Sequence, residues 1–219
     1  MRYTLQRMVL MAVVGAVVVG CASNMPVTPE TAKAIANREV TIAGCVAPPF
    51  MPMTPGRIML GVVGASIMAN AGPDLLAKNN IADPAAYIGE QLSQGLAAKY
   101  GIAVSSRSIT LYDDDVQAIA KSNPTADLVL EVRTTGWGFV NYPTDWEKYR
   151  VMYDARLRLI DAKGGSVLAA GDCHRWPDKT SSSPTYEELF LNGAERLKKE
   201  LREAAEFCVG EFKTKVFQM

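Results

Sequence analysis

The chain has 219 residues, enough for one or two domains. Hydrophobic residues make up 48% and charged residues 21%, which is typical of globular proteins and excludes a wholly disordered chain, a collagen and a multi-span membrane protein. The 23 basic side chains balance the 23 acidic ones, so no strong positive field exists to hold nucleic acid. Arg2 and Arg7 are the only charged residues among the first twenty. The remainder therefore has 21 basic and 23 acidic side chains, a net charge of −2 that favours a soluble surface.

A charged start followed by an apolar stretch marks residues 1–20 as a targeting segment. Met8–Val19 carries no charge, and its length is typical of a signal peptide and well below the roughly 20 residues needed to span a bilayer. The stretch ends in Val18-Val19-Gly20-Cys21, which resembles the lipobox of bacterial lipoproteins. The resemblance implies cleavage after Gly20 and attachment of diacylglycerol and an N-acyl chain to Cys21. An ordinary signal peptide and an uncleaved anchor are the alternatives.

Lipidation of Cys21 implies a location for the protein on a membrane. Several acyl chains on Cys21 would hold the mature protein on a membrane. Ala22 follows the cysteine. In enteric-type bacteria an aspartate at that position tends to retain lipoproteins in the inner membrane, so the resemblance favours the outer membrane over the inner one, with the protein facing the periplasm. We therefore expect a signal peptide (1–20), a lipidated tether (21–28) and a single compact periplasmic domain (29–219).

Three cysteines remain once Cys21 carries lipid. In an oxidising compartment two of them are expected to form a disulfide. We predict a bond between Cys173, which ends an expected strand, and Cys208, which lies on the apolar stripe of the last expected helix. Cys45 then stays free and buried or pairs between subunits. A disulfide that includes Cys45, or none at all, is the alternative.

Short elements open the expected domain. Thr28-Pro29-Glu30 predicts a helix that starts with Thr28 as N-cap and runs to Asn37. Val40–Gly44 is predicted to be a strand. Four prolines within residues 48–56 exclude a helix or a central strand there and predict a stiff loop.

An uncharged segment comes next. Ile58–Ala71 is too short for a confident membrane span, and its small residues would allow close backbone packing. Three alternatives stay open for this segment: a buried strand or helix, an oligomer contact, or a loop that touches a membrane. Its small residues are Gly61, Gly64, Ala65 and Ala69.

The clearest helix follows Asp83-Pro84 and ends at Gly101. Ile88, Leu92 and Leu96 recur every four residues, which predicts one buried stripe. Two short strands, 102–104 and 109–111, are expected after it. The run Asp113-Asp114-Asp115 then precedes a second helix that runs through Ala120. Acidic residues favour helix N-termini, so we interpret the run as a cap in preference to a cation site.

The pattern turns to strands from Ala126 onwards. Strands are predicted at 127–135, 149–160 and 166–173, with the turn of a hairpin at 161–165. Thr185–Glu188 matches a capping box, which opens a last helix that covers the hairpin. The expected fold class is therefore α+β, with a mixed or antiparallel sheet covered by helices. The predicted buried face of the second strand consists of Val151, Tyr153, Ala155, Leu157 and Leu159.

Two short motifs carry a family resemblance. Ala126–Leu130 and the Arg158–Leu168 hairpin are similar to segments of the periplasmic lipoprotein group that includes CsgG, LpoB and the N-terminal domain of TolB. The resemblance covers about residues 40–208. In that group the first strand usually runs into a phenylalanine, whereas Cys45 and the proline-rich loop interrupt it here. The resemblance implies the fold and the compartment, and no functional residue.

Five aromatic residues crowd the segment Trp137–Tyr149. Aromatic side chains favour interfaces because they combine a large apolar body with a polar tip. Gly138 and Pro143 suggest a loop between strands. Two interpretations stay open: Trp137 and Tyr149 pack in the core at strand ends, or the segment contacts a protein, a glycan or a membrane. The candidate partner-binding residues are Trp137, Phe139, Tyr142 and Trp146.

No catalytic or metal-binding constellation is visible. His174 is the only histidine, and on a strand it would face away from its neighbour Cys173, so the two cannot form a dyad. GxSxG, HExxH and repeated CxxC motifs are absent from the sequence. We expect no cofactor beyond the acyl chains on Cys21. A pair of carboxylates working on glycans stays open because the chain has 23 acidic residues.

Three functions are consistent with these patterns. The first is a lipid-anchored periplasmic binding or scaffold protein that supports an envelope assembly by docking a protein partner through the aromatic segment or through residues 58–71. The second is an oligomeric component of an export apparatus that packs through residues 58–71. The third is a carboxylate-dependent hydrolase of cell wall or glycan, which we rank last. All three place the membrane contact at Cys21 and none involves nucleic acid.

Overall fold

The computed structural model describes residues 24–219, which form the predicted α+β fold. Six helices and one mixed sheet of six strands make up this part of the chain. The helices are α1 (Pro29–Ile35), α2 (Pro55–Ile58), α3 (Gly61–Asn79), α4 (Ala85–Tyr100), α5 (Val116–Ser122) and α6 (Tyr186–Lys215). The strands are β1 (Glu39–Cys45), β2 (Met51–Met53), β3 (Ala103–Leu111), β4 (Leu128–Tyr142), β5 (Asp145–Asp161) and β6 (Ser166–Arg175).

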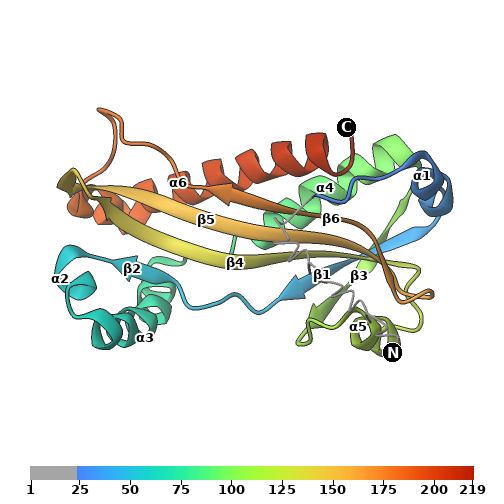
Figure 1. The fold of residues 1–219 in the computed structure, drawn as a ribbon, viewed down its shortest axis with the longest axis horizontal. Helices are drawn as coiled ribbons and strands as arrows, with labels where there is room; N and C mark the ends of the chain where they lie inside the picture. The colour runs from blue at the N-terminus through green and yellow to red at the C-terminus, as the bar shows by residue number, and fades with distance from the viewer. Residues whose placement is uncertain (1–23) are drawn as a thin grey trace, which may run out of the picture.

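The sheet combines a parallel and an antiparallel half. Its strand order is β3-β1-β4-β5-β6, and β2 pairs with β4 beyond the end of β1. β1 runs parallel to β3 and β4, and β2 runs parallel to β4, whereas β4, β5 and β6 are antiparallel neighbours. β4 and β5 run along most of the molecule (Figure 1). The two long strands therefore connect elements that lie at opposite ends.

One face of the sheet is covered by α4 and α6, which lie above it in Figure 1. The alternation predicted for β5 is confirmed, because Val151, Tyr153, Ala155, Leu157 and Leu159 are all buried in the same core. The predicted stripe of α4 is confirmed as well, since its three members are fully buried there. The main core therefore fills the space between this face and two helices.

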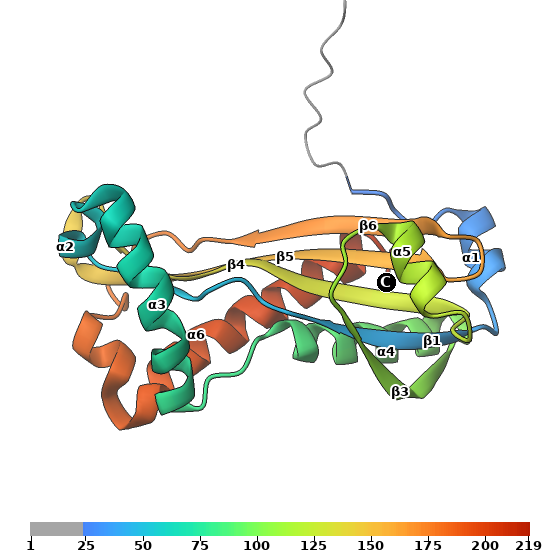
Figure 2. The same ribbon diagram turned by 90° about the horizontal axis from the view of Figure 1, so that it is seen from below.

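The other face of the sheet carries helices at its two ends. α5 lies at the end near the β5–β6 turn and α3 at the opposite end, with strands visible between them (Figure 2). Ile119 of α5 packs with Val129 and Ile160 in a second, smaller core. The predicted cap of α5 is confirmed, because the backbone N–H of Ala118 donates to the carboxylate of Asp115 at 2.8 Å.

The proline-rich segment departs from the prediction. Met51–Met53 forms β2, which has a single pairing partner, so Pro52 does not occupy a central strand. Pro55 opens the short helix α2, because proline at the first helical position removes only an N–H that lacks a helical partner anyway. The two short strands predicted at 102–104 and 109–111 are also one continuous strand, β3.

The expected tether is shorter than predicted. Met25 pairs with Ala170 of β6 through two backbone hydrogen bonds of 2.8 and 3.0 Å. The backbone N–H of Val27, a buried residue, donates to the carbonyl of Val216 near the C-terminus at 2.8 Å. The chain is therefore packed against the domain from Met25 onwards, and Cys21 lies outside the described residues.

α6 begins as predicted and then breaks. Thr185 and Glu188 form the reciprocal capping box, with the N–H of Glu188 donating to Thr185 and the N–H of Thr185 donating to Glu188. The helical backbone is interrupted at Leu191–Ala194, where Asn192 and Ala194 adopt left-handed conformations with φ of 53° and 62°. The expected single helix is therefore two helical pieces that meet at a bend.

The predicted disulfide is present. Cys173 of β6 and Cys208 of α6 are bonded, with their Cα atoms 5.6 Å apart, and both residues are buried. The bond fastens the second piece of α6 to the sheet. Cys45 is the one unbonded cysteine among residues 24–219, and it is half-buried at the end of β1.

Loss of this bond is expected to destabilise the domain. The disulfide closes a loop with a sequence separation of 35, so replacing both cysteines with alanine should lower the free energy of unfolding by about 3–4 kcal/mol. Urea unfolding of the oxidised protein and of the Cys173→Ala/Cys208→Ala variant measures the difference. Cys45→Ala is the matched control and should change stability by less than about 1 kcal/mol. An equal loss in the control would contradict the assignment.

Candidate functional site

Three of the four candidate partner-binding residues are part of the core. The segment Trp137–Tyr149 is a β-hairpin, because β4 continues to Tyr142 and β5 starts at Asp145. Trp137, Phe139 and Tyr142 are buried and cannot contact a partner, whereas the alternative of core packing is confirmed for Trp137 and Tyr149. The rings of Trp137 and Phe139 pack against Phe50, with ring centroids 5.1 and 5.9 Å apart. Trp146 is the exception, with 60% of its surface exposed at the tip of the hairpin.

The strongest feature of the surface lies beside this hairpin tip. Large apolar side chains are exposed at the end of α2, in the link between the two helices and in the first turns of α3, with Met59 78% and Val62 85% exposed. No charged residue occurs from position 58 to position 73. We call this the α2–α3 surface and define it by Ile58, Met59, Leu60, Val62, Val63 and Ile67, all of which are exposed.

Trp146 extends the α2–α3 surface onto the sheet. A cavity of about 240 Å³ lies between the hairpin and α2, and Trp146, Ile58 and Met59 line it together with Val140. Its remaining lining residues are uncharged. The structure thus brings together two features that were predicted separately, the uncharged segment and one tryptophan of the aromatic segment.

Glycines determine which side of α3 faces outwards. A methyl group on Gly64 would collide with the carbonyl of Arg57, and one on Gly72 would collide with the carbonyl of Phe50. Both glycines are buried, so the small residues allow α3 to pack closely against its own chain. Met68 is buried on the same side, whereas Val62, Val63 and Ile67 face solvent. Of the three alternatives for residues 58–71, a helix is observed, but its apolar side is not buried.

No helix among residues 24–219 is both long and apolar enough to cross a bilayer. Contiguous exposed apolar surface is uncommon on monomeric proteins and marks a site of contact with another molecule. The side chains of the α2–α3 surface offer packing area and no catalytic group. Chemically, this surface is suited to binding through the hydrophobic effect.

A second cluster, buried and ionic, lies on the open face of the sheet. Glu131 of β4 is fully buried and pairs with Arg158, with Arg133 at 2.9 Å and with Arg156 at 3.4 Å. Asp114, which precedes α5, pairs with the same three arginines. Burial alone would raise the pKa of Glu131, but the hydrogen bonds and charges of the arginines outweigh it and hold the pKa below its usual value.

Cys45 lies at the edge of this ionic cluster. Its Sγ is 3.7 Å from the carboxylate of Glu131. Burial and the nearby negative charge raise the pKa of Cys45 to about 11. The thiolate is therefore scarce at neutral pH, which makes this cysteine a poor nucleophile and slows disulfide exchange between subunits.

His174 does not form a catalytic pair with Cys173. Cys173 is bonded to Cys208, while the Nδ1 of His174 lies 2.9 Å from the carboxylate of Asp154. The same carboxylate oxygen accepts a hydrogen bond of 2.9 Å from the indole N–H of Trp176. In residues 24–219, no group of three or more histidine, cysteine, aspartate or glutamate side chains is placed to hold a metal ion.

Comparisons with known proteins leave the family open. No family model matches the chain, and no curated protein matches it. Among solved structures, the chain is similar in fold to the hypothetical protein CT253 from Chlamydia trachomatis. The two share 10% sequence identity, the match covers 84% of this chain and 100% of that chain, and the TM-score is 0.42. A PelC dodecamer from Paraburkholderia phytofirmans matches with 14% identity over 84% of this chain and 97% of that chain, with a TM-score of 0.31. Lipoprotein GNA1162 from Neisseria meningitidis matches with 17% identity over 80% of this chain and 99% of that chain, with a TM-score of 0.26. Such low similarity assigns neither a family nor a function.

The ionic cluster yields a pH prediction. A carboxylate whose pKa is lowered by folding stabilises the protein above its unfolded pKa, 4.5 for Glu131, and this stabilisation is lost as the pH falls through the folded pKa. Glu131→Gln removes one of the two carboxylates that the three arginines share, while Asp114 still pairs with them, so the substitution should cost about 1–3 kcal/mol at pH 7. The variant should also lose less stability than the wild type on acidification. Urea unfolding at several pH values measures both effects.

Glu147→Gln is the matched control for this experiment. Glu147 is exposed and makes no ion pair in the described part of the chain, so its replacement should change stability by less than about 0.5 kcal/mol. A Glu131→Gln variant as stable as this control at pH 7 would show that the cluster does not support the fold.

Proposed function

We propose that this chain is a lipid-anchored envelope lipoprotein that acts as a scaffold by docking a protein partner through the α2–α3 surface. The single observation that carries the proposal is the exposure of this surface, since Val62 alone is 85% exposed within a segment that has no charge. Leaving so much apolar surface in water is unfavourable by roughly 25 cal/mol per Å². A partner that covers the surface removes this cost.

The chemistry of the α2–α3 surface favours a protein over a membrane as the occupant. Binding of peripheral helices to anionic lipid is strengthened by lysine and arginine around the apolar side chains. Here Arg57 and Asp74 flank the uncharged segment with opposite charges, and no basic cluster accompanies it. The indole of Trp146 adds an amphipathic group of the kind that is enriched in protein interfaces.

The lipid anchor belongs to the same proposal. Ala22, Ser23 and Asn24 are the only residues between Cys21 and the packed Met25, a reach of about 13 Å at roughly 3.3 Å per residue. Acyl chains on Cys21 would thus hold the domain directly against the membrane, and Ala22 favours the outer membrane facing the periplasm. The disulfide between Cys173 and Cys208 suits an oxidising compartment of this kind.

The proposal is tested by crosslinking in membranes. A photoreactive amino acid placed at Val62 of the full chain should give one discrete adduct with a different protein. The same group at Val46, which is 64% exposed but lies outside the α2–α3 surface, is the matched control and should give none. Gel mobility and mass spectrometry of the adduct identify its second component.

Two other outcomes would overturn the docking role. An adduct between two copies of this chain would favour the oligomeric export component, and light scattering would then show a large assembly. Adducts with lipid alone would make the α2–α3 surface a second membrane contact. An unmodified thiol at Cys21 of the mature protein would contradict the proposed lipid anchor.

A further inference from the structure

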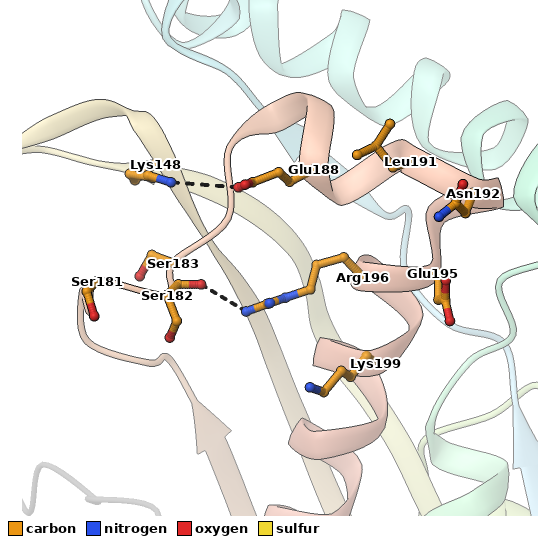
Figure 3. A pocket seen from close by; sticks show the side chains of 10 residues that line it. All are labelled: Lys148, Ser181, Ser182, Ser183, Glu188, Leu191, Asn192, Glu195, Arg196 and Lys199. Carbon is orange, nitrogen blue, oxygen red and sulfur yellow. Dashed lines mark hydrogen bonds and ion pairs between the residues drawn. The ribbon is translucent and has the colours of Figure 1, made fainter.

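Two adjoining cavities lie where α6 bends. The outer one, of about 520 Å³, is lined by residues on both sides of the bend and by three consecutive serines, Ser181, Ser182 and Ser183 (Figure 3). The inner one, of about 170 Å³, shares Ser182, Ser183 and Arg196 with it. The outer volume is within the range of pockets that hold small molecules, roughly 300–1,000 Å³. We call the pair the α6 cleft.

The backbone that frames the α6 cleft is strained. Ala194 has no side-chain group to compensate for a left-handed conformation, which costs roughly 1–2 kcal/mol relative to the ordinary helix. Its side chain is fully buried, so packing holds it in place. The bend leaves Leu191 and Asn192 on one side of the outer cavity and Arg196 on the other, where Arg196 donates to the carbonyl of Ser182 at 3.0 Å (Figure 3). Strain of this kind concentrates at functional sites.

Arg150 is the most unusual side chain of the inner cavity. Its guanidinium carbon lies 5.6 Å from the ring centroid of Tyr142 and 5.3 Å from that of Trp176, so two aromatic rings hold the group. Its Nε is buried without a hydrogen-bond partner. Within residues 24–219, Arg150 makes no ion pair with a carboxylate.

The inner cavity around Arg150 has more unpaired positive than unpaired negative side chains, which favours binding of an anion. Arg175, which lines the same cavity, stacks on Phe207 at 5.1 Å and also lacks an ion pair in the described part of the chain. Among the acidic residues of this cavity, Glu200 pairs with Arg196 at 2.7 Å and Glu203 with Lys199 at 3.8 Å. Asp178 is the only other carboxylate that lines it. Two unpaired guanidinium groups therefore face one unpaired carboxylate.

We propose that the α6 cleft binds a small hydroxylated molecule that carries a carboxylate or a phosphate, with Arg150 as the residue that holds the oxyanion. A planar guanidinium offers parallel N–H donors that match the oxygens of both groups. Ser183 is engaged with Thr180 and Tyr142, but the hydroxyl of Ser181, which makes no hydrogen bond within residues 24–219, can donate to and accept from hydroxyl groups of the remainder of the ligand. This site is separate from the α2–α3 surface and does not depend on the docking role.

Calorimetric titration of the purified full chain with three probes tests the site. Inorganic phosphate and glucuronate represent the two oxyanions, and glucose is the neutral control. We expect binding of at least one anionic probe and none of glucose. Phosphate binding alone identifies a phosphate ligand, and tighter binding of glucuronate identifies a sugar acid.

Substitutions then assign the oxyanion to Arg150. Arg150→Met should weaken binding of the anionic probe at least tenfold, and Arg150→Lys should weaken it as well, because an ammonium cannot present two parallel donors between the rings. Arg107→Met, an exposed arginine on β3, is the matched control and should leave affinity unchanged. If Arg150→Met lowers the melting temperature, the affinity of Arg150→Lys is compared with that of the wild type instead. Binding that is equally tight in both Arg150 variants, or no binding of either anion by the wild type, would overturn the proposal.

Discussion

The packing of α6 against the β5–β6 hairpin is the constraint on which most of the structure depends. The apolar stripe of α6 closes the main core, and the bond between Cys173 and Cys208 fastens the helix to β6. The residue that follows α6 also holds the N-terminal segment in place, because the carbonyl of Val216 accepts a hydrogen bond from the N–H of Val27. If α6 separated from the sheet, the core and the seating of the N-terminal segment would be lost together.

The bend in α6 follows from the same constraint. Before the bend, Phe190 packs with Phe139 of the long hairpin, and after it Leu197, Leu201 and Cys208 cover the middle of the sheet. β4 and β5 are long and twisted, so a single straight helix would not follow them from end to end (Figure 2). The cost of the left-handed residues at the bend is offset by burial on both sides. The bend also forms the α6 cleft, which residues from both pieces of the helix line.

The other face of the sheet shows the opposite arrangement. α3 lies there with Gly64, Met68 and Gly72 buried, while Val62, Val63 and Ile67 are exposed to solvent. The buried contacts of Gly64 and Gly72 leave no room to rotate the helix. The exposure of the α2–α3 surface is therefore set by the chain's own backbone packing, and a binding partner supplies a physical reason for it.

Local patterns in the sequence predicted local structure well. The four-residue spacing on α4, the alternation on β5, the capping box of Thr185 and Glu188 and the disulfide partners could all be inferred, because each depends on neighbouring residues or on the facing of two elements. Three features could not be inferred, because each depends on contacts with segments that are distant in the sequence. They are the direction in which α3 faces, the burial of Trp137 and Phe139, and the bend in α6. The ionic cluster around Glu131 was missed because its pairs join β4, β5 and the residues before α5, and only the register of the sheet brings them together.

The central proposal is that a protein covers the α2–α3 surface in the cell envelope. Hydrogen–deuterium exchange of the backbone amides at residues 62–67 tests it most directly, by comparing the chain in native membranes with the purified chain reconstituted in vesicles of the same lipids. Docking predicts slower exchange of these amides in native membranes, with unchanged exchange in α4. Equal exchange of residues 62–67 in the two preparations would contradict the claim, because lipid contact or an open surface would be the same in both.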